Sequence, residues 1–522
     1  MTTIAAGQSG SYTFTELSNV TVSLDSGEHA LVVVLSSAGD QLFSDRASST
    51  KTIGPFPTGA VLTVTADGAA VDYAVSTAKA DGNFASYTGK EAVSYATDPD
   101  TGLDVLDAGS KVAVQSFRRA TLPSRAAALL GAPVTISAGR ANVGIDPKSL
   151  VPLDPKVSAT VYYVDVTNGN DTNNGTTWAL AVKSIWKAVT LGNTAAVPYT
   201  VNIAPGVYFR ANGFSNSGTE VIPTQSCLIQ GANGQAICVS GDSHTWTLES
   251  GTTYQVTRSN AKRVFDMSGV DDDGDFYEFT LAASLAACRA TPGSWYTDNT
   301  TTYVNRLDGA AATAANTMVI LQAINTIRAT TSGNMHMYRI TQYGGNSGCI
   351  KISGNTTGKF YAEDCAFKYS STSTYIDNVQ SLDYALCVFN RCIASKAQKD
   401  GFNFHTANSV IPAAILFDCK GYGNGTATAS TSNNGVTMHD AGVLIDFNGR
   451  YWGNYGGDFA HANAGTMAVG VCTHTGGSPG DEIRGGVVPA GTGFHSVDSS
   501  AIYKYDCVGE DLITGAGSIT VS

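Results

Sequence analysis

The chain is poor in charged residues and has no long apolar run. Charged residues make up 14% of its 522 residues, against roughly 25% in an average globular domain. The aliphatic run from Ala30 to Leu35 is far shorter than the roughly 20 residues that cross a bilayer. The N-terminal sequence MTTIAAGQSGSY has neither the basic nor the apolar segment of a signal peptide. We therefore expect no membrane insertion and no export signal.

Positive charge is scarce as well, and the cysteines lack metal-site spacing. Lys and Arg total 31 against 43 Asp and Glu, and a net charge of −12 argues against a nucleic-acid partner. The ten cysteines include no CxxC pair. Without an export signal we expect reduced thiols rather than disulfides. We expect no cofactor, and Ca²⁺ enters only through one alternative considered below.

What is present instead is a β-rich texture, with 56 glycines and short alternating apolar segments. Val20, Val22 and Leu24 follow the period of two that is typical of half-buried strands. We divide the chain into a small β-domain at 1–80, a linker or adaptor at 81–158, and a long repetitive region at 159–522. Within that region, helical spacing predicts a capping helix over 178–191, and 245–335 reads as an inserted antiparallel subdomain.

Internal repeats predict the fold of the long region. Asp364-Cys365, Arg391-Cys392 and Asp418-Cys419 follow one another at intervals of 27 residues, and Asp446-Phe447 comes 28 residues after the third pair. Each pair ends an apolar strand. A second set of strands ends in histidine, at His405, His439, His461 and His495. Coils of variable length with two fixed strand positions are typical of a parallel β-helix.

Alternation along the strands predicts which side chains point into such a helix. One ladder is expected to point inward, and it consists of Cys365, Cys392, Cys419 and Phe447. A second is expected to point outward, and it consists of Asp364, Arg391, Asp418 and Asp446. The strands that end in histidine are expected to present Asn403, His405, Thr437, His439 and His495 outward. The direction of His461 does not follow from the alternation.

Several motifs resemble the right-handed parallel β-helix proteins of bacteriophage tailspikes and tail fibres, in the superfamily that includes pectate lyases. They lie at 162–165, 169–175, 178–189, 203–208, 400–405 and 433–440, and the resemblance covers about 160–522. It implies an all-β, right-handed parallel β-helix and a homotrimer. It also implies an N-terminal domain that attaches to a virion tail or baseplate protein, a place in the virion tail, and a bacterial surface polysaccharide as the partner. No catalytic motif of the family maps onto this chain residue by residue.

The strands that end in histidine supply the first candidate for catalysis. A histidine–carboxylate set can act as general acid and base in glycosidic hydrolysis or in β-elimination. The alternative is a structural ladder of stacked rings. The candidate residues are Asp400, His405, His439, Asp440, Asp458 and His461.

The outward acidic stripe supplies the second candidate. Carboxylates on adjacent coils lie about 5 Å apart, which suits a retaining glycosidase, and this describes Asp418 and Asp446. Carboxylates two coils apart, such as Asp364 and Asp418, approach the roughly 9.5 Å limit of an inverting enzyme. The alternative is a structural ladder in which Arg391 bridges two aspartates.

Aromatic side chains beside the same coils are candidates for stacking on sugar rings, with packing between turns as the alternative. The candidate substrate-binding residues are Asn403, Tyr422, Tyr451, Trp452 and Tyr455. The acidic segment 271–275 lacks the spacing of a calcium loop, and we interpret it as a solvated turn.

Three functions remain open from the sequence. The first is a tailspike subunit that binds and depolymerises a capsule or O-antigen. The second is a non-catalytic receptor-binding tail fibre of the same fold. The third is a free pectate-lyase-like enzyme, in which Asp364, Asp418 and Asp446 would hold Ca²⁺ and Arg391 or Arg450 would act as base.

Overall fold

The computed structural model describes most of the chain beyond residue 117, and ten strands before it. The described residues are the strands between Thr2 and Asp107 and the ranges 118–137, 139–210, 220–271, 273–321, 327–329, 333–345, 348–353, 357–370, 376–382, 384–407, 410–425, 433–461, 465–476, 493–509, 511–514 and 516–522. The chain divides into two compact units, Met1–Val114 and Gln115–Ser522.

The first unit is built from antiparallel strands, as its alternating sequence predicts. Its two four-stranded sheets have the orders β1-β8-β3-β6 and β2-β7-β4-β5, and β9 pairs with β10. The strands are β1 (Thr2–Ile4), β2 (Ser9–Thr13), β3 (Ser18–Ser23), β4 (His29–Leu35), β5 (Gln41–Ala47), β6 (Lys51–Phe56), β7 (Val61–Asp67), β8 (Val71–Thr77), β9 (Ser94–Thr97) and β10 (Asp104–Asp107).

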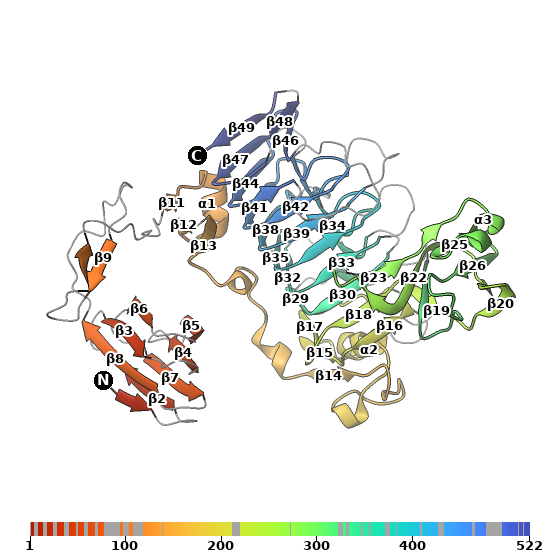
Figure 1. Cartoon of the computed structure of the whole chain (residues 1–522), viewed down its shortest axis with the longest axis horizontal. Helices are drawn as coiled ribbons and strands as arrows, with labels where there is room; N and C mark the ends of the chain where they lie inside the picture. Colours follow the sequence, from red (N-terminus) through yellow and green to blue (C-terminus); the bar gives the residue numbers. More distant parts are fainter. Residues whose placement is uncertain are drawn as a thin grey trace. The chain divides into compact units, whose positions relative to one another are not determined.

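The second unit contains the predicted right-handed parallel β-helix, in which three parallel sheets run along one axis (Figure 1). Sheet 1 consists of β14 (Val161–Val164), β15 (Tyr199–Ile203), β17 (Cys227–Gly231), β29 (Met335–Tyr338), β32 (Lys359–Glu363), β35 (Leu386–Asn390), β38 (Ala413–Phe417), β41 (Val443–Phe447), β44 (Met467–Val471), β47 (Ala501–Tyr505) and β49 (Ser518–Val521). Sheet 2 consists of β16 (Gly206–Phe209), β18 (Ala236–Val239), β30 (Ile340–Tyr343), β33 (Ala366–Lys368), β36 (Ile393–Ser395), β39 (Lys420–Tyr422), β42 (Arg450–Trp452) and β45 (His474–Thr475). Sheet 3 consists of β28 (Ile327–Ala329), β31 (Ile350–Ile352), β34 (Val379–Leu382), β37 (Phe402–His405), β40 (Val436–Met438), β43 (Phe459–His461), β46 (Phe494–Val497) and β48 (Asp511–Thr514).

The three cysteines of the predicted ladder stack inside the helix, but Phe447 does not join them. It pairs with Phe417 and is buried in the cluster on the outer face of sheet 1. Ala366 pairs with Ile393, and Ile393 pairs with Lys420, so the cysteines that precede them occupy equivalent places on successive coils. Cys365, Cys392 and Cys419 are fully buried in the main apolar core. Small, weakly polar thiols fit this narrow interior, and all described cysteines are free.

The residue before each of these three cysteines turns the corner between sheets 1 and 2 in the left-handed region of φ. Equivalent residues turn the same corner on other coils. The members of this corner are Arg339 (52°), Asp364 (53°), Arg391 (51°), Asp418 (52°), Asn448 (58°), Cys472 (54°) and Asp506 (55°). Four of the seven are Asp or Asn, which tolerate this conformation best among residues other than glycine. The repeated dipeptide in the sequence therefore marks a backbone corner.

The predicted placement of Asp446 in this corner is wrong. Phe417 pairs with Phe447, so Asp446 lies beside Leu416 and Asn448 is the residue equivalent to Asp418. The coil is longer than the 28-residue interval implied. Asp446 points into the core, in the space left by Gly449, whose added Cβ would come within 2.2 Å of the Asp446 carboxylate.

A cover built from residues 118–151 packs on the outer face of sheet 1. It contains β11 (Arg118–Ala120), α1 (Ser124–Leu130), β12 (Val134–Ser137), β13 (Arg140–Val143) and the 3₁₀ turn Pro147–Leu150, and a second such turn follows at Pro155–Ser158. Leu130, Val134 and Ile136 are buried in one cluster with Ile415 and Ile445 of the sheet. Strands of sheet 1 are apolar on both faces because each face is covered. This segment falls within the predicted linker at 81–158.

The predicted capping helix is present but begins later and ends later than 178–191. A 3₁₀ turn spans Trp178–Leu180, and α2 spans Ile185–Ala195, beside β14 and β15 (Figure 1). Ser184 caps α2 by accepting a hydrogen bond from the Lys187 amide at 3.1 Å. Gly192 lies inside α2. It gives room to the Tyr199 ring, which would lie 2.6 Å from an added Cβ.

The insertion spans Gly241 to Leu321 and forms two small, mainly antiparallel sheets with the orders β19-β27-β22-β23 and β20-β21-β26-β25-β24. Its elements are β19 (Gly241–Ser243), β20 (Thr247–Ser250), β21 (Thr253–Thr257), β22 (Ala261–Val270), β23 (Phe276–Glu278), β24 (Thr280–Leu281), α3 (Leu285–Ala290), β25 (Ser294–Thr297), β26 (Thr301–Asn305) and β27 (Thr317–Leu321). No helix in the described part of the chain is long and apolar enough to span a bilayer.

The interpretation of the acidic segment 271–275 as a solvated turn is wrong for Asp275. Its buried carboxylate pairs with Lys368 on sheet 2 and accepts hydrogen bonds from Tyr343 and Tyr369 at 3.3 Å each. This contact holds the insertion against the β-helix.

Candidate functional site

Two of the predicted histidines form a stacked pair on sheet 3. His405 ends β37 and His439 directly follows β40, and the pairing of Phe404 with Met438 brings them to equivalent places on adjacent coils. Their ring centroids are 3.9 Å apart and their planes differ by 12°. Both residues are partly exposed. The strands thus place two parallel, partly exposed imidazoles side by side.

Asp440 completes this group. Its Oδ2 lies 3.7 Å from His405 Nδ1 and accepts a hydrogen bond from the Thr406 amide at 3.0 Å. Burial, followed by the neighbouring His439 and Lys399, lowers the pKa of His405 to about 4. The ring is therefore neutral near pH 7 and able to accept a proton.

Asp400 lies apart from the imidazoles, in a buried ladder with Asp377, which the sequence analysis did not select. The Asp400 amide donates to Asp377 Oδ1 at 3.2 Å, and the Asn434 amide donates to Asp400 Oδ1 at 2.7 Å. Continuing this pattern, the Gly457 amide donates to Asn434 Oδ1 at 2.7 Å. Side chains that satisfy the amides of the next coil have a structural role.

The second oxygens of the two aspartates converge. Asn403 Nδ2 donates to Asp377 Oδ2 at 2.9 Å and to Asp400 Oδ2 at 3.0 Å, and Lys399 Nζ lies 3.4 Å from the latter. Burial and the charge of Asp400 raise the pKa of Asp377 to about 7. Asn403 is fully buried. The expectation that it faces outward toward a sugar is therefore wrong.

The other predicted members of the histidine group do not join it. Asp458 is buried and accepts hydrogen bonds from Asn454 Nδ2 at 2.7 Å and from the Gly476 amide at 2.8 Å. Burial raises the pKa of Asp458 to about 6. His461 pairs with Met438 rather than with His439, and its side chain lies outside the described residues. His495 pairs with Ala460, in the column of Thr437.

The acidic stripe does not form the predicted carboxylate pairs. Arg391 Nε lies 2.7 Å from Asp364, and Arg140 of the cover lies 2.6 Å from Asp418. Asp446 is buried and accepts hydrogen bonds from Tyr451 Oη at 2.8 Å and Thr473 Oγ1 at 2.6 Å.

This arrangement separates Asp446 from Asp364 and Asp418, so the calcium set of the pectate-lyase-like alternative is not assembled. Burial raises the pKa of Asp446 to about 7, which fits a core position. Among the described residues, no three His, Cys, Asp or Glu side chains are grouped to hold a metal ion.

Two of the predicted aromatic residues form a stack on the outer face of sheet 2. Tyr422 and Trp452 are paired on β39 and β42, and their rings lie 4.4 Å apart with an interplanar angle of 7°. Trp452 is partly exposed. Tyr422 is buried, so its predicted contact with a sugar is wrong. Tyr455 is partly exposed in the following turn. Tyr451 is wrong as a sugar platform, because it points inward and is fully buried.

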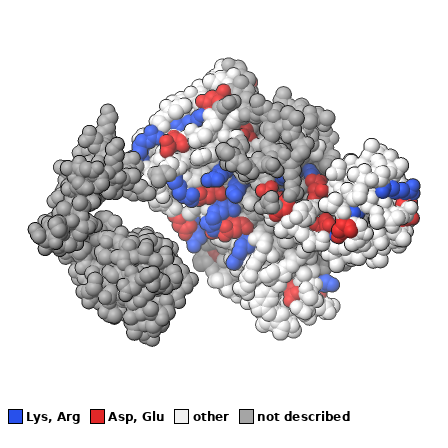
Figure 2. Space-filling model, viewed as in Figure 1, with Lys and Arg blue, Asp and Glu red and all other residues white. Residues whose placement is uncertain are grey.

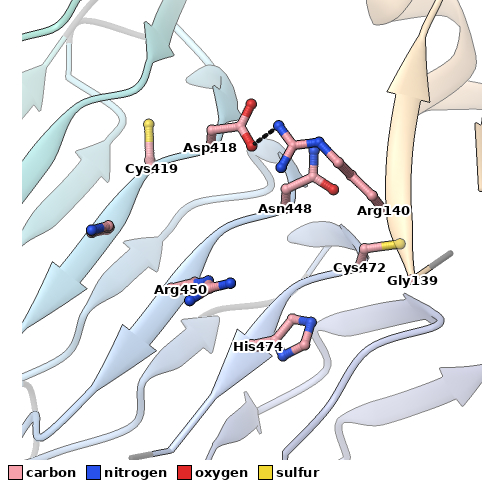
Figure 3. Close-up of a pocket in the computed structure, with 9 residues that line it drawn as sticks. Gly139, Arg140, Asp418, Cys419, Asn448, Arg450, Cys472 and His474 are labelled. Atoms are coloured by element: carbon pink, nitrogen blue, oxygen red, sulfur yellow. Dashed lines mark hydrogen bonds and ion pairs between the residues drawn. The ribbon is translucent and has the colours of Figure 1, made fainter. Parts of the chain in front are cut away.

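A pocket of about 440 Å³ lies at the seam between the cover and the corner of sheets 1 and 2 (Figure 3). It is lined by Gly139, Arg140, Asp418, Cys419, Lys420, Asn448, Arg450, Cys472 and His474. This pocket could not be predicted from the sequence, because Arg140 lies some 280 positions before Asp418 and reaches it only through the cover. Of the lining residues, Asp418, Cys419 and Arg450 were predicted in other roles.

No family model and no curated protein sequence matches the chain. Among solved structures, it is similar to a glycoside hydrolase with 9% identity and a TM-score of 0.43, over 69% of this chain and 96% of that one. It is also similar to XylC in complex with xylose, with 11% identity and a TM-score of 0.38, over 70% of each chain. A GH136 lacto-N-biosidase from Eubacterium ramulus matches at 12% identity and a TM-score of 0.22, over 70% of this chain and 68% of that one. Values of this size carry no statement about substrate or mechanism.

Proposed function

We propose that the chain is a bacteriophage tailspike subunit that binds a bacterial surface polysaccharide and depolymerises it on the outer face of sheet 3. The observation that carries this proposal is the partly exposed pair of His405 and His439 beside the carboxylate of Asp440. A neutral imidazole next to a carboxylate can accept a proton from a reacting group and have the resulting charge stabilised.

The chemistry open to this group is proton transfer. Neutral His405 accepts a proton either from an attacking water or from the carbon next to a sugar carboxylate. Asp440 stabilises the imidazolium that forms, because its Oδ2 lies 3.7 Å from His405 Nδ1. The proton then passes to the oxygen of the broken glycosidic bond, which balances either hydrolysis or elimination.

A non-catalytic receptor-binding fibre is the second candidate, and the buried ladder favours it. Asp377, Asp400 and Asp458 are enclosed and hydrogen-bonded to amides of the fold. Of the carboxylates described beside the histidines, this leaves Asp440 partly exposed. Glycosidases generally use two carboxylates, whereas a binding protein needs none.

The experiment that separates these functions is incubation of the full chain with capsule or O-antigen. New reducing ends without ultraviolet absorbance indicate hydrolysis. New reducing ends together with the absorbance of an unsaturated uronate indicate elimination. A chain that binds the polysaccharide and releases no product is a receptor-binding fibre.

The assembly and the virion partner complete the proposal. We infer a homotrimer, because several copies of one weak saccharide site on a common stem gain affinity through avidity. We assign virion attachment to the unit Met1–Val114, because it is compact by itself. Light scattering should report the mass of three chains, and the mass of one chain would contradict the trimer.

A further inference from the structure

The outer face of sheet 2 carries two neighbouring columns of side chains that the proposed chemistry does not use. The alternation along β39 and β42 points residues two apart to the same side, while Gly421 and Tyr451 between them are buried. Register places the residues of each column on adjacent strands. The first column is Lys420, Arg450 and His474, and the second begins with Tyr422 and Trp452.

The first column places the positive charges of Lys420 and Arg450 opposite each other on adjacent strands, without a carboxylate partner among the described residues. The nearest acidic residue lining the pocket, Asp418, is already paired with Arg140 at 2.6 Å. Within the described residues, the side chains of Lys420, Arg450 and His474 form no ion pair or hydrogen bond, and all three are exposed. Like charges directly opposite each other on adjacent strands are destabilising. An anionic ligand would therefore reduce the repulsion between the charges of this column, which is a positive region in a chain with a net charge of −12.

The pocket gives this charge a defined shape. Arg140 of β13 and the corner residues form one wall, while Arg450 and His474 project from the strands of sheet 2 (Figure 3). A volume of about 440 Å³ falls in the usual range for small-ligand sites. Figure 2 shows charged side chains of both signs over the middle coils, on a surface that is otherwise mostly uncharged.

The second column adds an aromatic surface at the side of the pocket. Trp452 is two residues along β42 from Arg450, and one of its faces is stacked on Tyr422. The next residue in this column is Gly476, whose amide bonds to the Tyr451 carbonyl at 2.9 Å and which has no side chain to cover the ring. A guanidinium beside a partly exposed indole suits a ligand that combines an oxyanion with the apolar face of a ring.

We propose that this pocket binds the oxyanion of an acidic sugar unit, a carboxylate or a phosphate, in the polysaccharide. Arg450 and Lys420 hold the oxyanion by charge-assisted hydrogen bonds, and Trp452 stacks on the ring of the same or the adjoining sugar. The inference rests on the proposed function, because it names the class of that polysaccharide. It does not depend on catalysis at His405 and His439.

Calorimetric titration of the full chain with defined probes tests this site. The probes are tetragalacturonate for carboxylates, glucose 6-phosphate for phosphate, and maltotetraose as the neutral match. One acidic probe should bind at least about tenfold more tightly than maltotetraose, and Arg450→Gln or Lys420→Gln should weaken that binding about tenfold or more. Lys183→Gln, at an exposed lysine near the capping helix, should leave it unchanged. Higher salt should weaken it.

The outcomes separate this inference from the proposed function. Preference for tetragalacturonate or for glucose 6-phosphate identifies the oxyanion and supports the site. Equal binding of neutral and acidic probes, or unchanged binding in both pocket variants with melting temperatures intact, overturns it. Depolymerisation of the native polysaccharide can persist in that case. Conversely, acidic binding lost in Arg450→Gln supports the site even if no product is released.

Discussion

Individual buried acids and bases in this molecule titrate away from their ordinary values, and each shift has a structural cause. Asp446 is enclosed by Tyr451, Thr473 and Gly449 inside the helix, where burial raises its pKa to about 7. Burial and the adjacent His439 lower the pKa of His405 to about 4. These two groups make opposite contributions to the pH dependence of stability.

Asp446 should make the fold less stable as pH rises. Its folded pKa of about 7 lies above the unfolded value near 3.9, so the folded state holds more protons between them. Its contribution is fully present below about pH 4 and is lost as pH rises through about 7. Asp446→Asn should reduce this loss by the order of a few kcal/mol. The measurement is the free energy of urea unfolding of the wild type minus that of the variant, compared between pH 4 and pH 7. An unchanged difference would contradict the buried, protonated carboxyl.

His405 should act in the other direction. Its folded pKa of about 4 lies below the unfolded value near 6.5, so the unfolded state binds the proton first. The contribution of His405 is present above about pH 6.5 and is lost as pH falls toward 4. Urea midpoints at several pH values should show this slope in the wild type and a smaller one in His405→Gln. Equal slopes would place the imidazole in an environment like water.

At the scale of elements, the cover on sheet 1 is a main determinant of stability in the second unit. Leu130 of α1 is almost fully buried against the outer face of the sheet. Arg125 fixes the same helix by donating to the Gly465 carbonyl at 2.9 Å. Without the cover, the apolar outer face of the strands of sheet 1 from β32 to β47 would be exposed to solvent, and such a patch favours aggregation.

Leu130→Ala should lower the free energy of unfolding of this unit by about 2–5 kcal/mol, because it leaves a cavity in a closed cluster. Leu129→Ala is the matched control, since Leu129 is only partly buried and should cost less. Thermal or urea unfolding measures both. Equal losses, or no loss in Leu130→Ala, would show that the cover is not docked as described.

The elements also show how far the sequence predicted the fold and where it failed. The 27-residue interval was enough to predict the cysteine ladder, because equal spacing on parallel coils means equal position. The predicted placement of Asp446 was wrong because its coil is longer. Matching residue types concealed a shift in register. The cover was not predicted because the residues on which it packs lie hundreds of positions away in the sequence, and no local pattern in 118–151 shows this contact.

The candidate site was predicted in part for the same reasons. Alternation correctly put His405 and His439 on one face, because both follow strands in register. It also put Asn403 on that face, but alternation gives a direction and not what covers a side chain. The pocket needed Arg140 and Arg450 together, and only the folded chain brings them together.

At the scale of the whole molecule, we propose that the compact N-terminal unit serves for attachment and that the β-helix carries one reactive face and one acidic-sugar pocket. Catalysis on the reactive face can be tested with substitutions that spare the fold. His439→Ala and Asp440→Asn change side chains that are partly exposed, so the fold and its melting should remain largely intact.

The most direct test is the rate of depolymerisation of the host polysaccharide by the wild type and by His439→Ala, Asp440→Asn and His495→Ala. Asp440→Asn should lose about 10²–10⁴-fold in turnover, because Asp440 stabilises the proton on His405. His439→Ala should also slow turnover, because the His439 ring stacks on that base. His495→Ala, at a partly exposed histidine in a different column of the same sheet, should retain the wild-type rate. Wild-type turnover in both His439→Ala and Asp440→Asn would contradict the account and reduce the histidine pair to a structural stack.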